Sequence, residues 1–263
     1  MSTLLSTLSP AETLMLLDPK SSTGRRLVQS TITHLAFKDV LKISTHKAKI
    51  PKTKKLITNY YVQRGSNYGK VPLSPLEKIT VTPLEQVAVK APLPLFAFNV
   101  EANMAGTLNS IKEKYVYPSL VDKGLIKKSI LNRFFLSFKS TAAGKQLADE
   151  LQHALYEFNQ ILSLHFSPSA FINWIGKYGT CFLVGDINYT LLEKYRLTTL
   201  QHALDQVKER EISHQAFNEH ENLLYEFLFQ FLPNPDFNFI TFSNYFYMQI
   251  DLGFDSDFYT HTA

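Results

Sequence analysis

The sequence predicts an α+β protein that is mainly helical, with two helix–hairpin units followed by a helical C-terminal region. Apolar residues recur every third or fourth position over much of the chain, which is the spacing of one helix face. Two short stretches, around residues 42–64 and 125–138, instead alternate like strands of hairpins. We place the first unit at residues 1–101, the second at 102–166 and the helical region at 167–263, and expect all three to pack as one body.

The first helix is marked by a capping box. Ser9 is expected to cap it, a proline occupies the first helical position, and Glu12 completes the box. Asp18–Pro19 is expected to end this short apolar helix. Residues 21–26 form a predicted turn, and residues 27–41 a second helix.

A basic loop follows the second helix. Residues 42–44 begin a strand and residues 56–64 are its partner. The segment between them, residues 46–55, contains no acidic residue. Its lysines are Lys47, Lys49, Lys52, Lys54 and Lys55. Ammonium groups at this density favour an anionic surface, so these residues are candidates for binding nucleic acid or another anion. A solvated loop that only keeps the protein in solution is the alternative.

The proline-rich stretch at residues 65–101 is predicted to be an ordered connector. Short extended pieces are expected at 78–81 and 86–89, and helix is expected to return near Asn103. The hydrophobic content of the stretch argues against a flexible linker.

The central stretch predicts a helix, a tight turn, a hairpin and a second helix. Gly124 follows a helical pattern and fits a left-handed C-cap. Leu125 and Ile126 begin a strand, and residues 134–138 alternate as a second one. Thr141 is expected to cap a helix at residues 142–158.

This stretch resembles a known domain family. The segment FLSFKSTAAGKQLADEL, residues 135–151, is similar to the wing strand and closing helix of PadR- and MarR-type winged helices, where a Thr–x–x–Gly step often separates the two. Residues 9–64 follow the same element order more loosely. The resemblance implies two winged-helix-like units with small β-hairpins, plus the helical C-terminal region. It supports a fold more than a function.

A second resemblance concerns the Golgi-phosphoprotein family of phosphoinositide binders. Residues 9–43 look like the opening of that family, and KEKYVYPSLVDKGLIKK with FFLSF is similar to its second block. The likeness implies a mostly helical monomer that docks on anionic membrane. The lipid-contacting tryptophan and paired arginines have no aligned counterpart, since Trp174 lies too late in the chain. Arg25 and Arg26 lie in the predicted turn and are candidates for meeting an anion.

Composition and motifs argue against several classes. The net charge of +4 is too small to imply nucleic acid by itself. No secretory signal and no transmembrane run are visible, and a single cysteine in the apolar setting of Cys181 predicts a core thiol with a raised pKa. His214 and His220 are spaced six apart, so they do not share a helix face as zinc ligands would. We expect a cytoplasmic protein without cofactor, metal or catalytic residues.

Three functions remain open. The leading hypothesis is a non-enzymatic binding or scaffold protein with a protein partner or self-association. The alternatives are a DNA-binding regulator that uses the basic loop at residues 47–55 and a peripheral protein on an anionic membrane surface. A candidate recognition helix at residues 30–41 carries groups that can contact bases, but a helix that reads sequence normally has a denser polar face, which argues against this route. The groups are Gln29, Ser30, Thr33, His34 and Lys38. The aromatic segment at residues 237–247 either closes the core or forms a contact patch.

Overall fold

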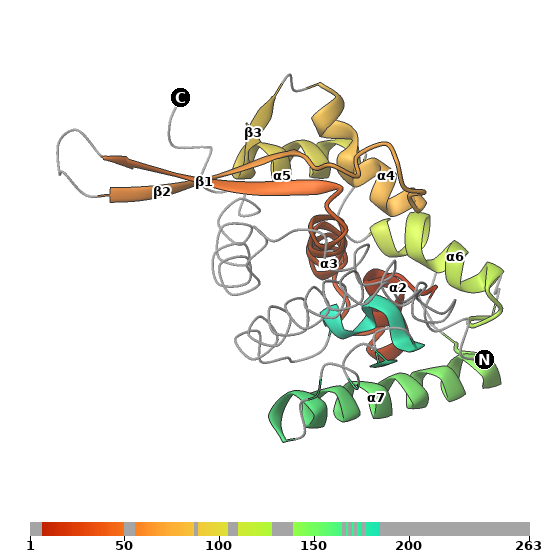
Figure 1. Ribbon diagram of the computed structural model, residues 1–263. Coiled ribbons are helices and arrows are strands. Elements are labelled where there is room, and N and C mark those ends of the chain that lie inside the picture. The colour runs from red at the N-terminus through yellow and green to blue at the C-terminus, as the bar shows by residue number, and fades with distance from the viewer. Residues whose placement is uncertain are drawn as a thin grey trace, which may run out of the picture.

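The computed structural model describes residues 7–49, 56–86, 89–104, 110–127, 139–164 and 177–184, with the isolated positions 167, 170, 173 and 174. Its helices are α2 (Pro10–Leu17), α3 (Gly24–Phe37), α4 (Pro75–Val81), α5 (Leu93–Asn103), α6 (Tyr117–Asp122) and α7 (Ala142–Ser163). Further short helical segments are the 3-10 helices η1 (Thr82–Glu85) and η4 (Gly179–Val184) and the π-helix η2 (Lys112–Val116). The strands are β1 (Leu41–Lys49), β2 (Leu56–Arg64) and β3 (Lys90–Pro92), which form one antiparallel sheet. The predicted α+β, mainly helical class is confirmed (Figure 1).

Helix α3 lies at the centre of the fold and is buried along almost its whole length. Its apolar side chains, including Leu27, Ile32 and Leu35, are inaccessible to solvent because α2, α4, β1 and η4 all pack against it. The buried apolar side chains, from Leu8 to Leu183, form one hydrophobic cluster in space. All three predicted segments contribute side chains to it. Helix α7 packs across α2 and η4 on the side away from the sheet (Figure 1).

The capping box of α2 is confirmed. The backbone N–H of Glu12 donates to Ser9 Oγ at 3.3 Å, and the backbone N–H of Ser9 donates to Glu12 Oε2 at 2.7 Å. The helix ends at Leu17, as the Asp–Pro step predicts. The predicted turn at residues 21–26 is too long, because Thr23 caps α3 through the N–H of Arg26. Arg25 and Arg26 therefore belong to the first turn of α3.

The predicted hairpin is confirmed and is longer than expected. Strands β1 and β2 pair from Leu41 opposite Arg64 to Lys49 opposite Leu56. Residues 46–49, which we assigned to the loop, extend β1 because the pairing continues through them. Strand β3 pairs only with residues 61–63 of β2, so the distal part of the hairpin is a two-stranded projection (Figure 1).

The connector prediction is wrong in its secondary structure. Residues 78–81, expected to be extended, are the second half of α4, and helix returns at Leu93 rather than near Asn103. The reason lies in Ser74–Pro–Leu–Glu77, which repeats the Ser–Pro–x–Glu pattern of α2 and forms the same capping box. Of the predicted extended piece at 86–89, residues 87 and 88 lie outside the described residues, and the strand that follows is β3.

The central stretch follows its prediction where the structure describes it. Gly124 has φ +70°, and the N–H groups of Gly124 and Leu125 donate to the carbonyls of Val121 and Leu120, a Schellman cap for α6. Ile126 forms an antiparallel bridge with Ser140, the base of the expected hairpin. The predicted strand at 134–138 lies outside the described residues. Thr141 caps α7, which continues to Ser163, beyond the expected end.

The start of the third segment packs onto α7. The indole Nε1–H of Trp174 donates to the Ala154 carbonyl at 3.1 Å, and its ring lies 4.3 Å from that of Phe158. Cys181 is fully buried, and burial raises the pKa of its thiol to about 12, in agreement with the predicted core thiol. His214, His220 and the aromatic segment 237–247 lie outside the described residues. None of the described helices has the length and apolar character needed to cross a membrane.

Candidate functional site

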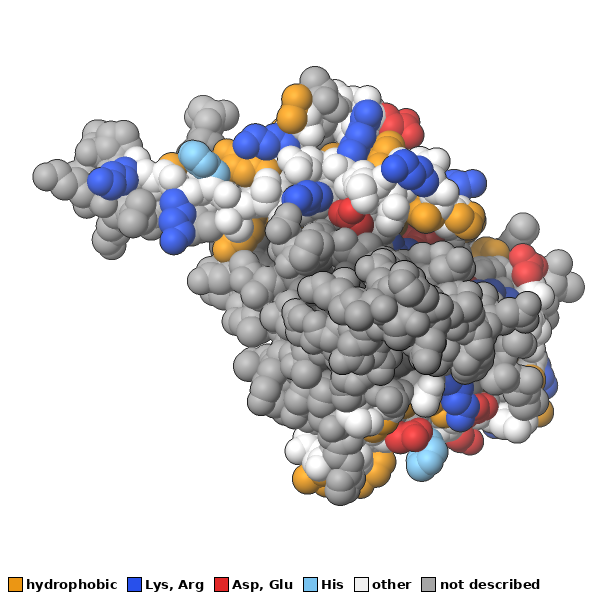
Figure 2. Space-filling view, viewed as in Figure 1, with side chains coloured by type: hydrophobic (Ala, Val, Ile, Leu, Met, Phe, Trp, Pro, Cys, Tyr) orange, Lys and Arg blue, Asp and Glu red, His pale blue; other side chains and the backbone are white. Residues whose placement is uncertain are grey.

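The distal part of the β1–β2 hairpin is the first candidate site. We call residues 45–49 and 56–59 the arm. Thr45, His46, Lys47 and Lys49 are all exposed, and the arm extends beyond the helices (Figure 1). Figure 2 shows Lys and His side chains along this projection, with no acidic side chain among them on the face in view. The arm is therefore a narrow cationic surface.

The charge of the arm belongs to a longer acid-free segment. Residues 40–76 contain no Asp and no Glu. Their cations are Lys42, Lys47, Lys49, Lys52, Lys54, Lys55, Arg64 and Lys70. Lys52, Lys54 and Lys55 lie outside the described residues. Arg64 is turned to the body, where its Nη2 donates to the Leu84 carbonyl at 2.7 Å. At the base of the arm, the Lys90 ammonium lies 4.4 Å from the centre of the Tyr61 ring and adds another cation.

The base of the arm is tied to the body by a polar turn. Asp39 has φ +51° and accepts hydrogen bonds at its carboxylate from the backbone N–H and the hydroxyl of Ser66. Its carbonyl accepts from the N–H of Asn67 at 2.9 Å, and the Asn67 amide donates to the Lys38 carbonyl. These bonds join the two ends of the hairpin where it leaves the core. The direction of the arm is therefore determined by the body.

The candidate recognition helix is not available to read bases. Gln29, Ser30, Thr33 and His34 are all less than 8 % exposed. The hydroxyls of Ser30 and Thr33 donate to carbonyls within α3 itself. Lys38 caps the helix at its C-terminal end and is half-buried. The expectation that these residues can contact bases is wrong, because the helix that carries them is the centre of the core.

Arg25 and Arg26 do not join the arm. They lie in the first turn of α3, whereas the arm leaves from its last, and 14 residues of helix span roughly 20 Å. Arg26 is exposed, and its Nη1 donates to the Ser21 carbonyl at 3.3 Å. The two groups of candidate cations are thus separate surfaces.

A polar cavity of about 270 Å³ is the second candidate site. It lies where α2, α3, α4, α6 and η4 meet. Its walls are Thr7, Leu8, Ser9, Glu12, His34, Lys38, Pro72, Ser74, Glu77, Ser119, Lys123 and Thr180. Both capping boxes border it, because Ser9 and Ser74 cap the two helices that reach it.

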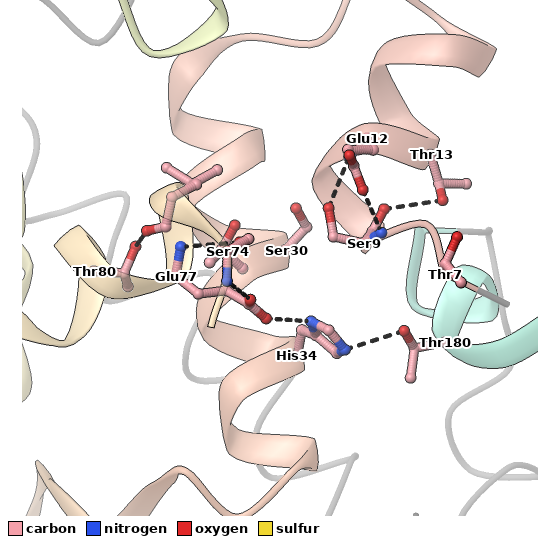
Figure 3. Close-up of polar contacts among 12 residues, drawn as sticks. Thr7, Ser9, Glu12, Thr13, Ser30, His34, Ser74, Glu77, Thr80 and Thr180 are labelled. Atoms are coloured by element: carbon pink, nitrogen blue, oxygen red, sulfur yellow. Dashed lines mark hydrogen bonds and ion pairs between the residues drawn. The ribbon is translucent and has the colours of Figure 1, made fainter. Parts of the chain in front are cut away.

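Three side chains form a chain of contacts in this cavity (Figure 3). His34 Nδ1 lies 3.0 Å from Glu77 Oε1, and His34 Nε2 lies 3.1 Å from Thr180 Oγ1. Burial lowers the pKa of His34, with the neighbouring Glu77 acting in the opposite direction, so the imidazole is neutral at pH 7. Burial favours the neutral form of Glu77, but the contact with His34 and the charge of nearby Lys38 outweigh it and lower the pKa of this carboxyl.

The two capping-box glutamates play matching roles. Each gives one oxygen to the backbone N–H of its own cap and turns the other toward a different element. Glu77 faces His34, and Glu12 Oε1 accepts from Ser119 Oγ and from Lys123 Nζ, both at 2.6 Å. The repeated Ser–Pro–x–Glu pattern marks both glutamates in the sequence. The side chains that meet them, 107 or more residues away for Glu12, carry no such signal.

Comparison with protein-family models, with curated proteins and with solved structures finds no match to this chain. Within the described ranges, no group of three or more His, Cys, Asp and Glu side chains is arranged to hold a metal ion. The arm and the cavity are therefore the features of the described residues that bear on function.

Proposed function

We propose that this is a binding protein whose β1–β2 arm contacts the phosphate backbone of duplex nucleic acid. The observation that carries the proposal is a two-stranded projection with exposed Lys47 and Lys49, in a segment without any acidic residue. Each ammonium group that replaces a counterion near a phosphate contributes salt-dependent affinity. We thus keep the DNA-binding hypothesis from the sequence, but limit the expected contact to the phosphate backbone.

The dimensions of the arm fit this role. The five residues of β1 that belong to the arm, residues 45–49, span about 17 Å at roughly 3.4 Å per residue. The major groove of B-DNA admits a two-stranded β-ribbon. The arm therefore supports contact with a duplex rather than with a small anion.

The burial of α3 decides what kind of binding to expect. The groups that read base edges are inside the core, so phosphate contacts dominate. The element order α2, α3, β1, β2 resembles the end of a winged helix, a domain in which the wing touches the DNA backbone beside the groove. This resemblance supports binding through the wing alone. We expect affinities for unrelated duplex sequences to agree within a fewfold.

The test is fluorescence anisotropy with a labelled duplex of about 20 base pairs, over a series of salt concentrations. Changing Lys47 and Lys49 to Gln is expected to weaken binding and to reduce the slope of log K against log salt by about 2. Changing Lys52, Lys54 and Lys55 in addition is expected to abolish binding at 0.15 M salt.

The matched control changes Lys139 and Lys145 to Gln, which removes the same charge from exposed positions at and near the start of α7. This control is expected to keep the affinity of the wild type. Equal losses in both variants would show that net charge, not the arm, is responsible. Binding to phosphatidylserine vesicles without binding to duplex would replace the proposal with the anionic-membrane alternative.

Contact with a protein is the second candidate function, and exposed apolar side chains favour it. Leu95 and Phe98 lie one turn apart on α5 and are 49 % and 54 % exposed. Pairs of this kind are typical of contact patches. Analytical ultracentrifugation is expected to show mass above 30.1 kDa at high concentration, and Leu95→Glu with Phe98→Glu is expected to restore the monomer. Tyr156→Glu, on α7, is the control, and a wild type that stays monomeric would contradict self-association.

A further inference from the structure

We propose that Thr180, His34 and Glu77 form a hydrolytic centre for small uncharged esters, with Thr180 as the nucleophile. The sequence contains no catalytic motif, which led us to expect a protein without enzymatic activity. The residues of this cluster are separated by up to 146 positions, so no motif could mark them. The inference rests on the geometry of the cavity and does not depend on nucleic-acid binding by the arm.

The contacts determine where the protons lie. Glu77 Oε1 lies 3.0 Å from His34 Nδ1, a close contact whose angles fall outside those of a hydrogen bond. The negative charge of Glu77 favours the tautomer of the neutral imidazole that carries its N–H on Nδ1. The lone pair of Nε2 then accepts the Thr180 hydroxyl proton over 3.1 Å. A hydroxyl beside a base, with the base held in turn by a carboxylate, is the arrangement that activates a weak nucleophile.

Each member is held by a different element. Thr180 comes from η4, His34 from the last turn of α3, and Glu77 from the third position of α4 (Figure 3). The capping box holds the other oxygen of Glu77, since Oε2 accepts from the N–H of Ser74 at 2.7 Å. The imidazole therefore has a carboxylate oxygen 3.0 Å from Nδ1 and a hydroxyl hydrogen-bonded to Nε2, and close placement of this kind is what positioned catalysis requires.

The cavity indicates the substrate class. Its charged side chains are Lys38, Lys123, Glu12 and Glu77, so their charges sum to zero when His34 is neutral. A volume of about 270 Å³ lies at the small end of ligand sites. Both properties fit a short uncharged ester better than a nucleotide or a peptide. Lys38 lines the same cavity and supplies positive charge for the oxyanion that forms during acyl transfer.

The reaction balances without a cofactor. Thr180 Oγ attacks the ester carbonyl carbon while its proton moves to His34 Nε2. The bond to the alcohol oxygen then breaks, and the alcohol leaves with that proton. Water next attacks the acyl-threonine, gives a proton to Nε2, and releases the carboxylic acid as Thr180 recovers its proton. The sum is ester plus water giving acid plus alcohol, with no change in oxidation state.

The test combines hydrolysis of p-nitrophenyl acetate with labelling by a fluorophosphonate and mass spectrometry of the peptides. Thr180→Val keeps the shape of the side chain and is expected to lower kcat/KM at least about 100-fold. Thr180→Ser is expected to retain both activity and labelling. Glu77→Gln is expected to lower kcat with little change in KM, because Glu77 positions the base and does not touch substrate.

The control is Thr33→Val, which removes a buried hydroxyl from α3 whose bond goes to the Gln29 carbonyl. It is expected to keep hydrolysis and labelling, with melting temperatures recorded for every variant. An adduct on the peptide that contains Thr180, absent from Thr180→Val, supports the proposal. Unchanged hydrolysis in Thr180→Val, no adduct in the wild type, or an adduct only at another residue overturns it and leaves a purely structural cluster.

Discussion

Replacement of Gly144 by alanine is expected to destabilise the protein by about 3 kcal/mol, more than the same change at Gly69 or Gly124, where no atom lies within 4 Å of an added Cβ. A Cβ at this position would lie 2.0 Å from the backbone oxygen of Leu125. That oxygen also accepts from the N–H of Thr141 at 3.0 Å and from its hydroxyl at 3.2 Å. The added methyl group must displace backbone, and the cap of α7 is lost with it.

The measurement is urea unfolding followed by circular dichroism, with Gly124→Ala as the matched control. Gly124 has φ +70° but open space around a Cβ, so its replacement carries only the cost of a left-handed backbone, about 1 kcal/mol. A Gly144→Ala variant that is no less stable than Gly124→Ala would mean that α7 does not start against Leu125. The Thr–x–x–Gly step thus has a physical reason, which is close contact between a helix start and a hairpin base.

Acidification is expected to destabilise the protein from about pH 6.5 downward through His34. Burial lowers the folded-state pKa of this imidazole below its usual 6.5, so the unfolded chain binds the proton first. The stability contributed by His34 is complete above pH 6.5 and is lost as the pH falls toward the folded pKa. The expected loss is up to about 1.4 kcal/mol for each pH unit.

Glu77 adds a loss of the same sign at lower pH. Its folded pKa lies below the usual 4.5, so its contribution is complete above pH 4.5 and falls below that value. The charged and polar groups that act on His34 are Glu77, Lys38, Glu12 and Thr180. The stability contributed by His34 is lost at higher pH than that contributed by Glu77, so the two effects can be measured separately.

The measurement is the free energy of unfolding at pH 7.0 and pH 5.5 for the wild type and for His34→Asn. Asparagine keeps a donor for Glu77 but does not titrate, so its stability is expected to change less between the two pH values. The other histidines are common to both proteins, so their effect cancels when the pH dependence of the unfolding free energy is compared. Equal pH dependence in the two proteins would show that His34 titrates with an ordinary pKa.

Local signals in the sequence predicted much of the fold. The capping box at Ser9, the Asp–Pro stop, the left-handed Gly124 and the cap at Thr141 are short-range patterns, and each has its expected partner within a few residues. The two alternating stretches at residues 42–64 likewise predicted the β1–β2 hairpin. Helix α4 was missed although Ser74–Pro–Leu–Glu77 is the same pattern as at Ser9, because the prolines around it were interpreted as connector.

Most of the helices and strands, and the excess of cations on the arm, can be predicted from local patterns, because caps, turns and alternation depend on neighbours in the chain. The burial of α3 and the contacts of His34 with Glu77 and Thr180 arise from packing between distant segments. Contacts over such separations depend on how helices pack, and a polar residue on a helix looks the same in sequence whether it faces water or another helix. The cavity forms where five elements that are distant in the sequence pack together, and local sequence patterns do not predict such packing.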